Sequence, residues 1–266
     1  MDSNILFGIC FFMTGAIIGS FLNVCIVRLP LEKSVVFPSS HCVACRTPIQ
    51  WYDNIPLISW LILGGRCRAC HEKISFRYWF VEFLTACIFL FFYEHYGLQA
   101  ILLPYLVMMC GFIVATFVDF GHRIIPDEVS IGGMIAGVFF SLIIPQLHGV
   151  HSPFLGFGLA VLGLLVGGGI IYLMGVIGDF VFKKETMGGG DVKLMGMVGA
   201  FLGWKLAILT FFLAPFFGAG FGIVEKIRTK DSTIAYGPFL IMGALVSLFW
   251  GDQIIHYVLA GGIYHL

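Results

Sequence analysis

Long apolar runs, separated by short polar interruptions, set the pattern of this chain. A helix that crosses a hydrocarbon core of about 30 Å needs roughly 20 apolar residues. By that measure we expect eight membrane spans, at residues 5–27, 79–95, 100–118, 129–145, 154–178, 191–203, 205–224 and 234–250. The pattern therefore predicts an all-α polytopic membrane protein with about eight transmembrane helices.

The composition agrees with a membrane protein. Of the 266 residues, 59% are hydrophobic and 11% are charged, whereas soluble domains carry about 25% charged residues. Most of the surface must therefore face the lipid bilayer. We expect a first transmembrane helix at residues 1–27, a small water-exposed domain at 28–78 and a transmembrane domain at 79–266.

The basic residues orient the predicted spans. Loops rich in Lys and Arg stay in the cytosol, and fourteen of the fifteen basic residues fall on one side, Lys205 being the exception. This places the N-terminus outside and the 28–78 domain inside. A single span over 191–224 would separate the basic residues that flank it, so we expect two short helices that meet near Gly203–Lys205.

Four cysteines in the 28–78 segment form two Cys-x-x-Cys pairs, Cys42 with Cys45 and Cys67 with Cys70. Each pair can aim two thiolates at one ion, and two pairs complete the tetrahedral shell of a structural zinc site. Disulfides or a redox pair are the alternative, and a membrane thiol oxidoreductase would follow from it. Because structural disulfides are rare in the cytosol, we favour a zinc ion that staples the small domain.

Two aspartates lie where a membrane helix meets the cytosol. Asp119 ends the third predicted span, and Asp191 follows three glycines, Gly188, Gly189 and Gly190, at the start of the sixth. An acidic side chain in a membrane span costs free energy, so such residues are candidates for a functional role. Both fall at the same predicted depth, where two adjacent carboxylates would share one proton and could activate water for peptide hydrolysis. The triple glycine would let a substrate strand approach the backbone closely.

Other interpretations of these acids stay open at this point. Asp191 alone could cap its helix, and Asp119 alone could pair with Arg123. Together, the two acids could also serve a proton- or cation-coupled membrane transporter. Such a transporter would predict broken helices in both halves and inverted repeats, and the sequence shows no internal repeat.

Several further motifs, taken in order, resemble the type IV prepilin peptidases, a family of GxGD-type intramembrane aspartyl proteases. The matching segments are residues 19–24, 28–30, 38–45, 54–56, 67–70, 77–82, Asp119 with 124–127, 188–193 and 236–239. The resemblance covers nearly the whole chain. It departs at Tyr236, where a phenylalanine is expected, and in the first cysteine pair, which lacks a common proline.

The resemblance implies a two-step activity at the bacterial inner membrane. Family members cleave the basic leader of type IV prepilins and pseudopilins, and many then methylate the new N-terminus with S-adenosylmethionine. It also implies that Asp119 and Asp191 are catalytic, that the four cysteines hold zinc, and that the 28–78 domain is associated with methyl transfer. Nucleic acid is not an expected partner, and the oligomeric state stays open.

Three acidic residues are weaker candidates. Asp127 and Glu128 lie on the predicted cytosolic face, where they could attract a basic leader. Glu82 opens the second span and could bind the substrate amine or the methyl donor. An ion pair of Glu82 with Arg77 or Arg28 is the alternative.

Overall fold

A computed structural model describes residues 3–183, 186–229 and 235–259 of the chain. Within these ranges the regular structure is helical, and β-structure is limited to two isolated bridges, His41 with Pro48 and Arg66 with Lys73. The α-helices are α1 Ser3–Arg28, α2 Ile58–Ile62, α3 Phe76–Tyr96, α4 Leu102–His122, α5 Asp127–Ile143, α6 Pro153–Phe182, α7 Gly189–Thr229 and α8 Gly237–Leu259. Three short 3₁₀ helices, η1 Leu29–Leu31, η2 Trp51–Asn54 and η3 Pro145–His148, lie in the connections.

Six of the described helices, α1, α3, α4, α6, α7 and α8, are long and apolar enough to cross a membrane. This confirms the prediction of an all-α membrane protein. Helix α5 occupies a further predicted span but has only 17 residues. Each of the eight predicted spans coincides with a helical segment, because α7 contains two of them.

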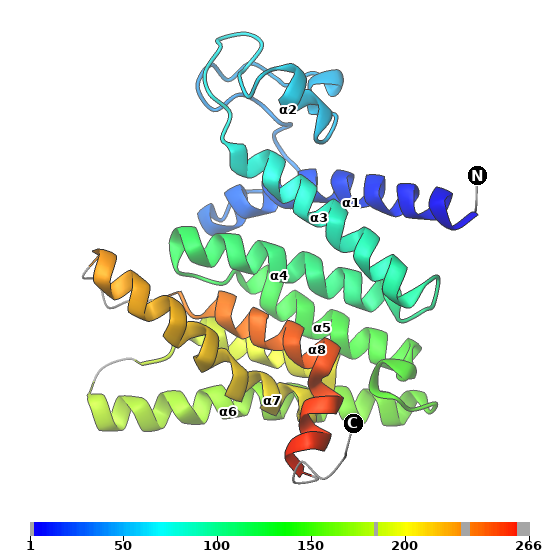
Figure 1. The fold of residues 1–266 in the computed structure, drawn as a ribbon. Coiled ribbons are helices and arrows are strands. Elements are labelled where there is room, and N and C mark those ends of the chain that lie inside the picture. The colour runs from blue at the N-terminus through cyan, green and yellow to red at the C-terminus, as the bar shows by residue number, and fades with distance from the viewer. Residues whose placement is uncertain (1–2, 184–185, 230–234, 260–266) are drawn as a thin grey trace. The chain divides into compact units, whose positions relative to one another are not determined.

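The chain divides into two compact units, Met1–Val114 and Ala115–Leu266, which are described separately. In the second unit, α7 packs against α5, α6 and α8 (Figure 1). The core of this unit includes fully buried Leu194, Met195 and Met197 from α7, and Ile171 from α6.

Helix α7 reverses direction at Gly203, the only residue inside it with non-helical backbone angles (φ 79°, ψ 168°). A Cβ built on Gly167 of α6 would meet both the Met195 carbonyl and the Ala207 side chain within 4 Å. In a straight helix these two residues would lie about 18 Å apart. The contacts confirm the expected pair of short helices, and a residue at 203 must adopt a positive φ that favours glycine.

The turn of this hairpin is held by a half-buried histidine. The Nε2 atom of His148 lies 2.8 Å from the Ser141 hydroxyl, and the His148 ring also hydrogen-bonds the backbone of Ala200. A Cβ on Gly203 would lie 3.2 Å from His148 Nδ1. Burial lowers the pKa of His148, so the ring is held in its neutral form.

In the first unit, α1 packs against α3 through small residues. A Cβ on Gly15 would lie 2.8 Å from the Ala86 backbone, and one on Gly19 would lie 2.8 Å from the Glu82 backbone. Small residues allow this close approach of two membrane helices. The buried Asn23 joins the helices with a hydrogen bond from its Nδ2 atom to the Tyr78 carbonyl (2.9 Å).

Candidate functional site

The second unit positions Asp119 in the last turn of α4, where only 5% of the residue surface is exposed. Its Oδ2 atom accepts a hydrogen bond from the backbone N–H of Gly237, the first residue of α8 (3.0 Å). A Cβ on Gly237 would lie 2.8 Å from Oδ2. Position 237 therefore has no room for a side chain while the carboxylate keeps this place.

Asp191 lies near Asp119 although the two acids come from different helices. The backbone next to each acid meets the buried Ile125: a Cβ on Gly190, the residue before Asp191, would lie 3.1 Å from the Ile125 Cβ, and one on Gly237, whose N–H bonds Asp119, would lie 3.1 Å from its Cδ1. The charge of Asp119 acts directly on Asp191. The structure thus brings together the two acids that the sequence predicted as a pair.

The backbone around Asp191 also explains the capping alternative. Asp191 is the third residue of α7, and its carboxylate accepts a hydrogen bond from the backbone of Gly188 just before the helix. An acid at this position satisfies one of the free N–H groups at a helix start. Capping and pairing with Asp119 are therefore compatible roles of one side chain.

Tyr236 completes the surroundings of the acids. Its ring lies against Gly218 of α7, and burial together with the Asp191 charge raises the pKa of Tyr236 to about 12. The phenol therefore keeps its proton at neutral pH and can act as a hydrogen-bond donor. The sequence motif 236–239 contained this residue and Gly237 but did not indicate what either one touches.

The segment that leads into the three glycines is fastened to α6. The Asp179 Oδ1 atom accepts hydrogen bonds from the Thr186 backbone N–H (2.7 Å) and from the Thr186 hydroxyl (2.9 Å). The same hydroxyl lies 3.3 Å from the Gly175 carbonyl. These hydrogen bonds, called here the Asp179–Thr186 latch, anchor the chain two residues before Gly188. No sequence motif pointed to them.

The two acids proposed for leader docking lie on the exposed start of α5. Asp127 forms an ion pair with Lys193, with 2.6 Å between Oδ1 and Nζ. Lys193 thus pairs with Asp127, and no ion pair with Asp191 is found in the described part of the chain. Glu128 is exposed, and no ion pair of Glu128 is found within the described ranges.

The first unit brings the four predicted cysteines together. Their Sγ atoms, from Cys42, Cys45, Cys67 and Cys70, all lie within 4.8 Å of one another. The sulfurs of Cys42 and Cys70 are 3.8 Å apart, and those of Cys45 and Cys67 are 4.0 Å apart. Four thiolates around zinc at 2.3 Å would be separated by about 3.8 Å, so the cluster can hold a metal ion.

Both cysteine turns have the same backbone. The N–H of Cys42 donates to the Thr47 carbonyl and that of Arg46 donates to the Cys42 carbonyl, and the second turn repeats this with Cys67 and His71. Arg46 and His71 both have a φ of 58°. Hydrogen bonds with Thr47 lower the pKa of Cys45 to about 6, whereas burial and hydrogen bonds with the other cysteines raise the pKa of Cys70 to about 12, so without a metal the four thiols do not ionise alike.

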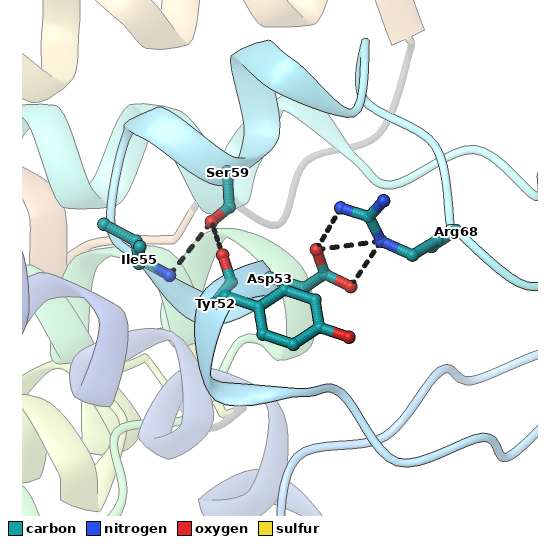
Figure 2. A network of polar contacts seen from close by, with 5 residues as sticks. All are labelled: Tyr52, Asp53, Ile55, Ser59 and Arg68. Carbon is teal, nitrogen blue, oxygen red and sulfur yellow. Dashed lines mark hydrogen bonds and ion pairs between the residues drawn. The ribbon is translucent and has the colours of Figure 1, made fainter.

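An ion pair ties the second cysteine turn to η2, and a serine ties η2 to α2 (Figure 2). Arg68 donates to both carboxylate oxygens of Asp53, the shortest distance being 2.6 Å from Nη2 to Oδ1. This pairing holds the pKa of Asp53 below its usual range. Ser59 accepts from the Ile55 N–H and donates to the Tyr52 carbonyl.

Glu82 forms hydrogen bonds within the first unit. Its Oε2 atom accepts a hydrogen bond from the Leu57 N–H (2.8 Å), and its carboxylate also bonds the Ser20 side chain. Arg28, one expected partner, instead donates to the carbonyls of Ser34 and Pro38. Glu82 therefore joins α1, α3 and the turn before α2.

Two family models match the chain. The model of the bacterial peptidase A24 N-terminal domain matches residues 13–96, which include the four cysteines, and that of the type IV leader peptidase family matches residues 106–223, which include both aspartates. Neither model supports a transporter.

Curated relatives agree with these matches. The prepilin leader peptidase/N-methyltransferase of Myxococcus xanthus is 38% identical over 84% of this chain and 64% of its own length. Proteins of the same name from Aeromonas salmonicida and Pseudomonas aeruginosa are 32% and 31% identical; the matches cover 94% and 93% of this chain, and 92% of each relative. No solved structure matches the chain.

Proposed function

The chain belongs to the type IV leader peptidase family, and we propose that it cleaves the leaders of type IV prepilins and pseudopilins and then methylates the new N-terminus. The observation that carries this proposal is that the segments holding Asp119 and Asp191 meet in the second unit, where Gly190 and Gly237, the hydrogen-bond partner of Asp119, both lie against Ile125. The names of the relatives support both activities.

In the proposed reaction, the two aspartates act on a water molecule and the scissile peptide. They share one proton, because two adjacent carboxylates do not both ionise readily. The ionised acid takes a proton from water while the water oxygen bonds to the peptide carbon, and the protonated acid donates its proton to the carbonyl oxygen. The C–N bond then breaks, the leaving amine takes the proton that the first acid removed from water, and the former carbonyl oxygen returns its proton to the second acid, so no covalent enzyme intermediate forms.

The backbone around the acids would position the substrate. Gly237 fixes Asp119 through its N–H, and Gly188 and Gly189 are exposed next to Asp191. We assign Gly188, Gly189 and Gly190 to substrate binding, because a stretch without side chains lets an extended peptide approach closely. The latch between Asp179 and Thr186 would hold this stretch in place.

Asp127 and Glu128 would attract the basic leader. Since Lys193 already pairs with Asp127, Glu128 should make the larger contribution. We expect Glu128→Lys to raise the KM for a Lys- and Arg-rich leader several-fold at low salt, with less effect at high salt. Asp127→Asn is the matched control and should change the KM less. An unchanged KM and salt dependence in Glu128→Lys excludes charge-guided docking.

The cysteine cluster would hold one structural zinc ion, and S-adenosylmethionine would supply the methyl group. Four thiolates leave no open position on a tetrahedral zinc ion, so the metal would staple the fold and take no part in catalysis. We assign residues 28–78 to a domain associated with methyl transfer and residues 79–266 to the protease. Both the zinc domain and the aspartates would lie on the cytosolic side of the bacterial inner membrane, in agreement with the charge pattern.

The experiment that tests both activities is mass spectrometry of a purified prepilin incubated with the detergent-solubilised protein and S-adenosylmethionine. We expect a product that has lost its leader and carries one methyl group on the new N-terminal amine. A cleaved but unmethylated product contradicts the second activity, and an uncut prepilin contradicts the first.

A further inference from the structure

Helix α2 exposes an apolar side, although it belongs to the domain that the sequence predicted to face water. Ile58, Leu61 and Ile62 lie at positions i, i+3 and i+4, which share one side of a helix. Their exposed fractions are 48%, 60% and 74%. Contiguous apolar side chains on the surface of a folded domain mark a contact with a partner or a membrane. These three residues are called here the apolar face of α2.

The opposite side of α2 is fixed to the first turn of α3. Trp60 lies edge-on to Phe76, with 5.7 Å between ring centroids, and its ring centroid is 6.4 Å from that of Trp79. Its Nε1 atom donates a hydrogen bond to the Ile74 carbonyl at 3.3 Å. Phe76 is the first residue of a helix that is long and apolar enough to cross a membrane. Helix α2 therefore lies beside the end of a membrane span.

Two hydrogen bonds show how deep the turn before α2 reaches along the membrane helices. The Leu57 N–H donates to Glu82 at 2.8 Å, and the Glu82 carboxylate also bonds the Ser20 side chain. At about 1.5 Å per residue, Glu82 lies about 9 Å from the start of α3, and Ser20 lies about 12 Å from the end of α1. The turn is therefore level with the interior of two membrane helices and not beyond their ends.

This depth is the one that an interfacial helix adopts. Such helices bury their apolar side about 5–10 Å into the boundary between lipid headgroups and acyl chains. The chain leaves α2 through Gly64 and Gly65, whose φ values of 57° and 65° turn it back towards the second cysteine pair. A short apolar segment that enters and returns on the same side of the bilayer fits this path.

The charges next to α2 also match a lipid surface. Arg66 directly follows the two glycines and forms a β-bridge with Lys73, and both residues are exposed. Anionic headgroups attract basic side chains at the membrane surface. Apolar side chains at membrane depth with basic side chains beside them therefore favour the bilayer over a protein partner.

We propose that the apolar face of α2 inserts into the lipid leaflet in which α3 begins, and that Arg66 and Lys73 contact its headgroups. The 28–78 domain is then held against the bilayer by α2 as well as by its connections to α1 and α3. This inference stands apart from both proposed activities, because it concerns only the contact with lipid.

Photocrosslinking of the full-length protein in nanodiscs of phosphatidylethanolamine and phosphatidylglycerol tests this contact. Benzoylphenylalanine replaces Leu61 in one sample. In the matched control it replaces Val43, which lies between the first two cysteines and is 86% exposed. After irradiation, mass spectrometry of the intact protein should show at least about fivefold more lipid adduct for position 61 than for position 43.

A charged double variant tests the same contact by a different measurement. Leu61→Asp combined with Ile62→Asp places two carboxylates on the apolar face, which should expel α2 from the leaflet. A protease added to the nanodiscs should then cut within residues 28–78 roughly tenfold faster than in the wild type. Val43→Asp is the control and should be cut at the wild-type rate. Retained zinc in both variants reports that the cysteine turns are folded.

Three results would overturn the proposal. Equal lipid adducts at positions 61 and 43 would show that α2 has no special contact with the bilayer. A crosslink from position 61 to a second copy of the chain, in place of lipid, would assign the apolar face to contact between copies. Digestion of the double variant at the wild-type rate would show that the apolar face does not hold the domain.

Discussion

The backbone N–H of Gly237 donates a hydrogen bond to Asp119 Oδ2 at 3.0 Å, across 118 positions of the sequence. The start of α8 thereby fixes an acid that α4 presents. Because a Cβ at position 237 would lie 2.8 Å from Oδ2, we expect Gly237→Ala to displace the carboxylate. Cleavage kinetics should show kcat reduced by roughly 10- to 100-fold, with a smaller change in KM.

A glycine elsewhere in the second unit provides the control for this substitution. A Cβ on Gly132 of α5 meets no atom within 4 Å, so Gly132→Ala should cleave at nearly the wild-type rate. Equal activity of Gly237→Ala and Gly132→Ala would show that the position of the Asp119 carboxylate does not depend on Gly237.

The Asp179–Thr186 latch should matter for catalysis although it lies outside the pair of acids. Thr186→Val removes the hydroxyl that bonds Asp179 and keeps the shape of the side chain. We expect the cleavage rate to fall about three- to tenfold as the glycine segment becomes less ordered. Thr186→Ser keeps the hydroxyl and should restore most of the rate. If Val and Ser variants are equally active, the latch has no part in positioning the glycines.

Loss of one cysteine should remove the metal and unfold the small domain. Purified wild-type protein should carry about one zinc ion per chain, and Cys42→Ser should carry almost none, as measured by atomic emission. Digestion with a protease should then cut the variant within residues 28–78 much faster than the wild type. Wild-type protein without zinc, or a variant that keeps it, would contradict a four-thiolate site.

The neutral His148 at the tip of the α7 hairpin predicts a dependence of stability on pH. Because burial lowers the pKa of His148 in the folded protein, the unfolded chain binds a proton more readily. Stability should therefore be full above about pH 6.5 and should fall as the pH drops below it, by at most about 1.4 kcal/mol per pH unit. Thermal unfolding in detergent at pH 5 to 8 measures this loss.

His148→Gln isolates the contribution of this residue to the pH dependence. The amide cannot titrate, so the fall in melting temperature between pH 6.5 and 5 should become smaller than in the wild type. An identical pH profile in wild type and variant would assign the acid sensitivity to other groups.

The sequence predicted the features that depend on local pattern. Apolar run lengths located the helices, the basic residues required a reversal near Gly203, and the Cys-x-x-Cys spacing identified the cluster. Each of these signals can be read from residue type and spacing along the chain, without knowing which segments touch.

Contacts between distant segments left no comparable signal. No sequence motif contains Asp179, and its bond to Thr186 depends on how the next loop folds back. The sequence offered a ligand or an arginine as partners of Glu82, but gave no sign of its hydrogen bond from the Leu57 N–H. Such partners follow from tertiary packing, which residue spacing does not reveal.

Cleavage of a purified prepilin by wild-type protein, Asp119→Asn and Asp191→Asn tests the central claim most directly. Asparagine keeps the shape of each side chain but cannot exchange the proton, so each variant should lose about 10³-fold or more of the cleavage rate while it retains zinc and melts like the wild type. Cleavage by either variant at the wild-type rate would contradict catalysis by the two aspartates.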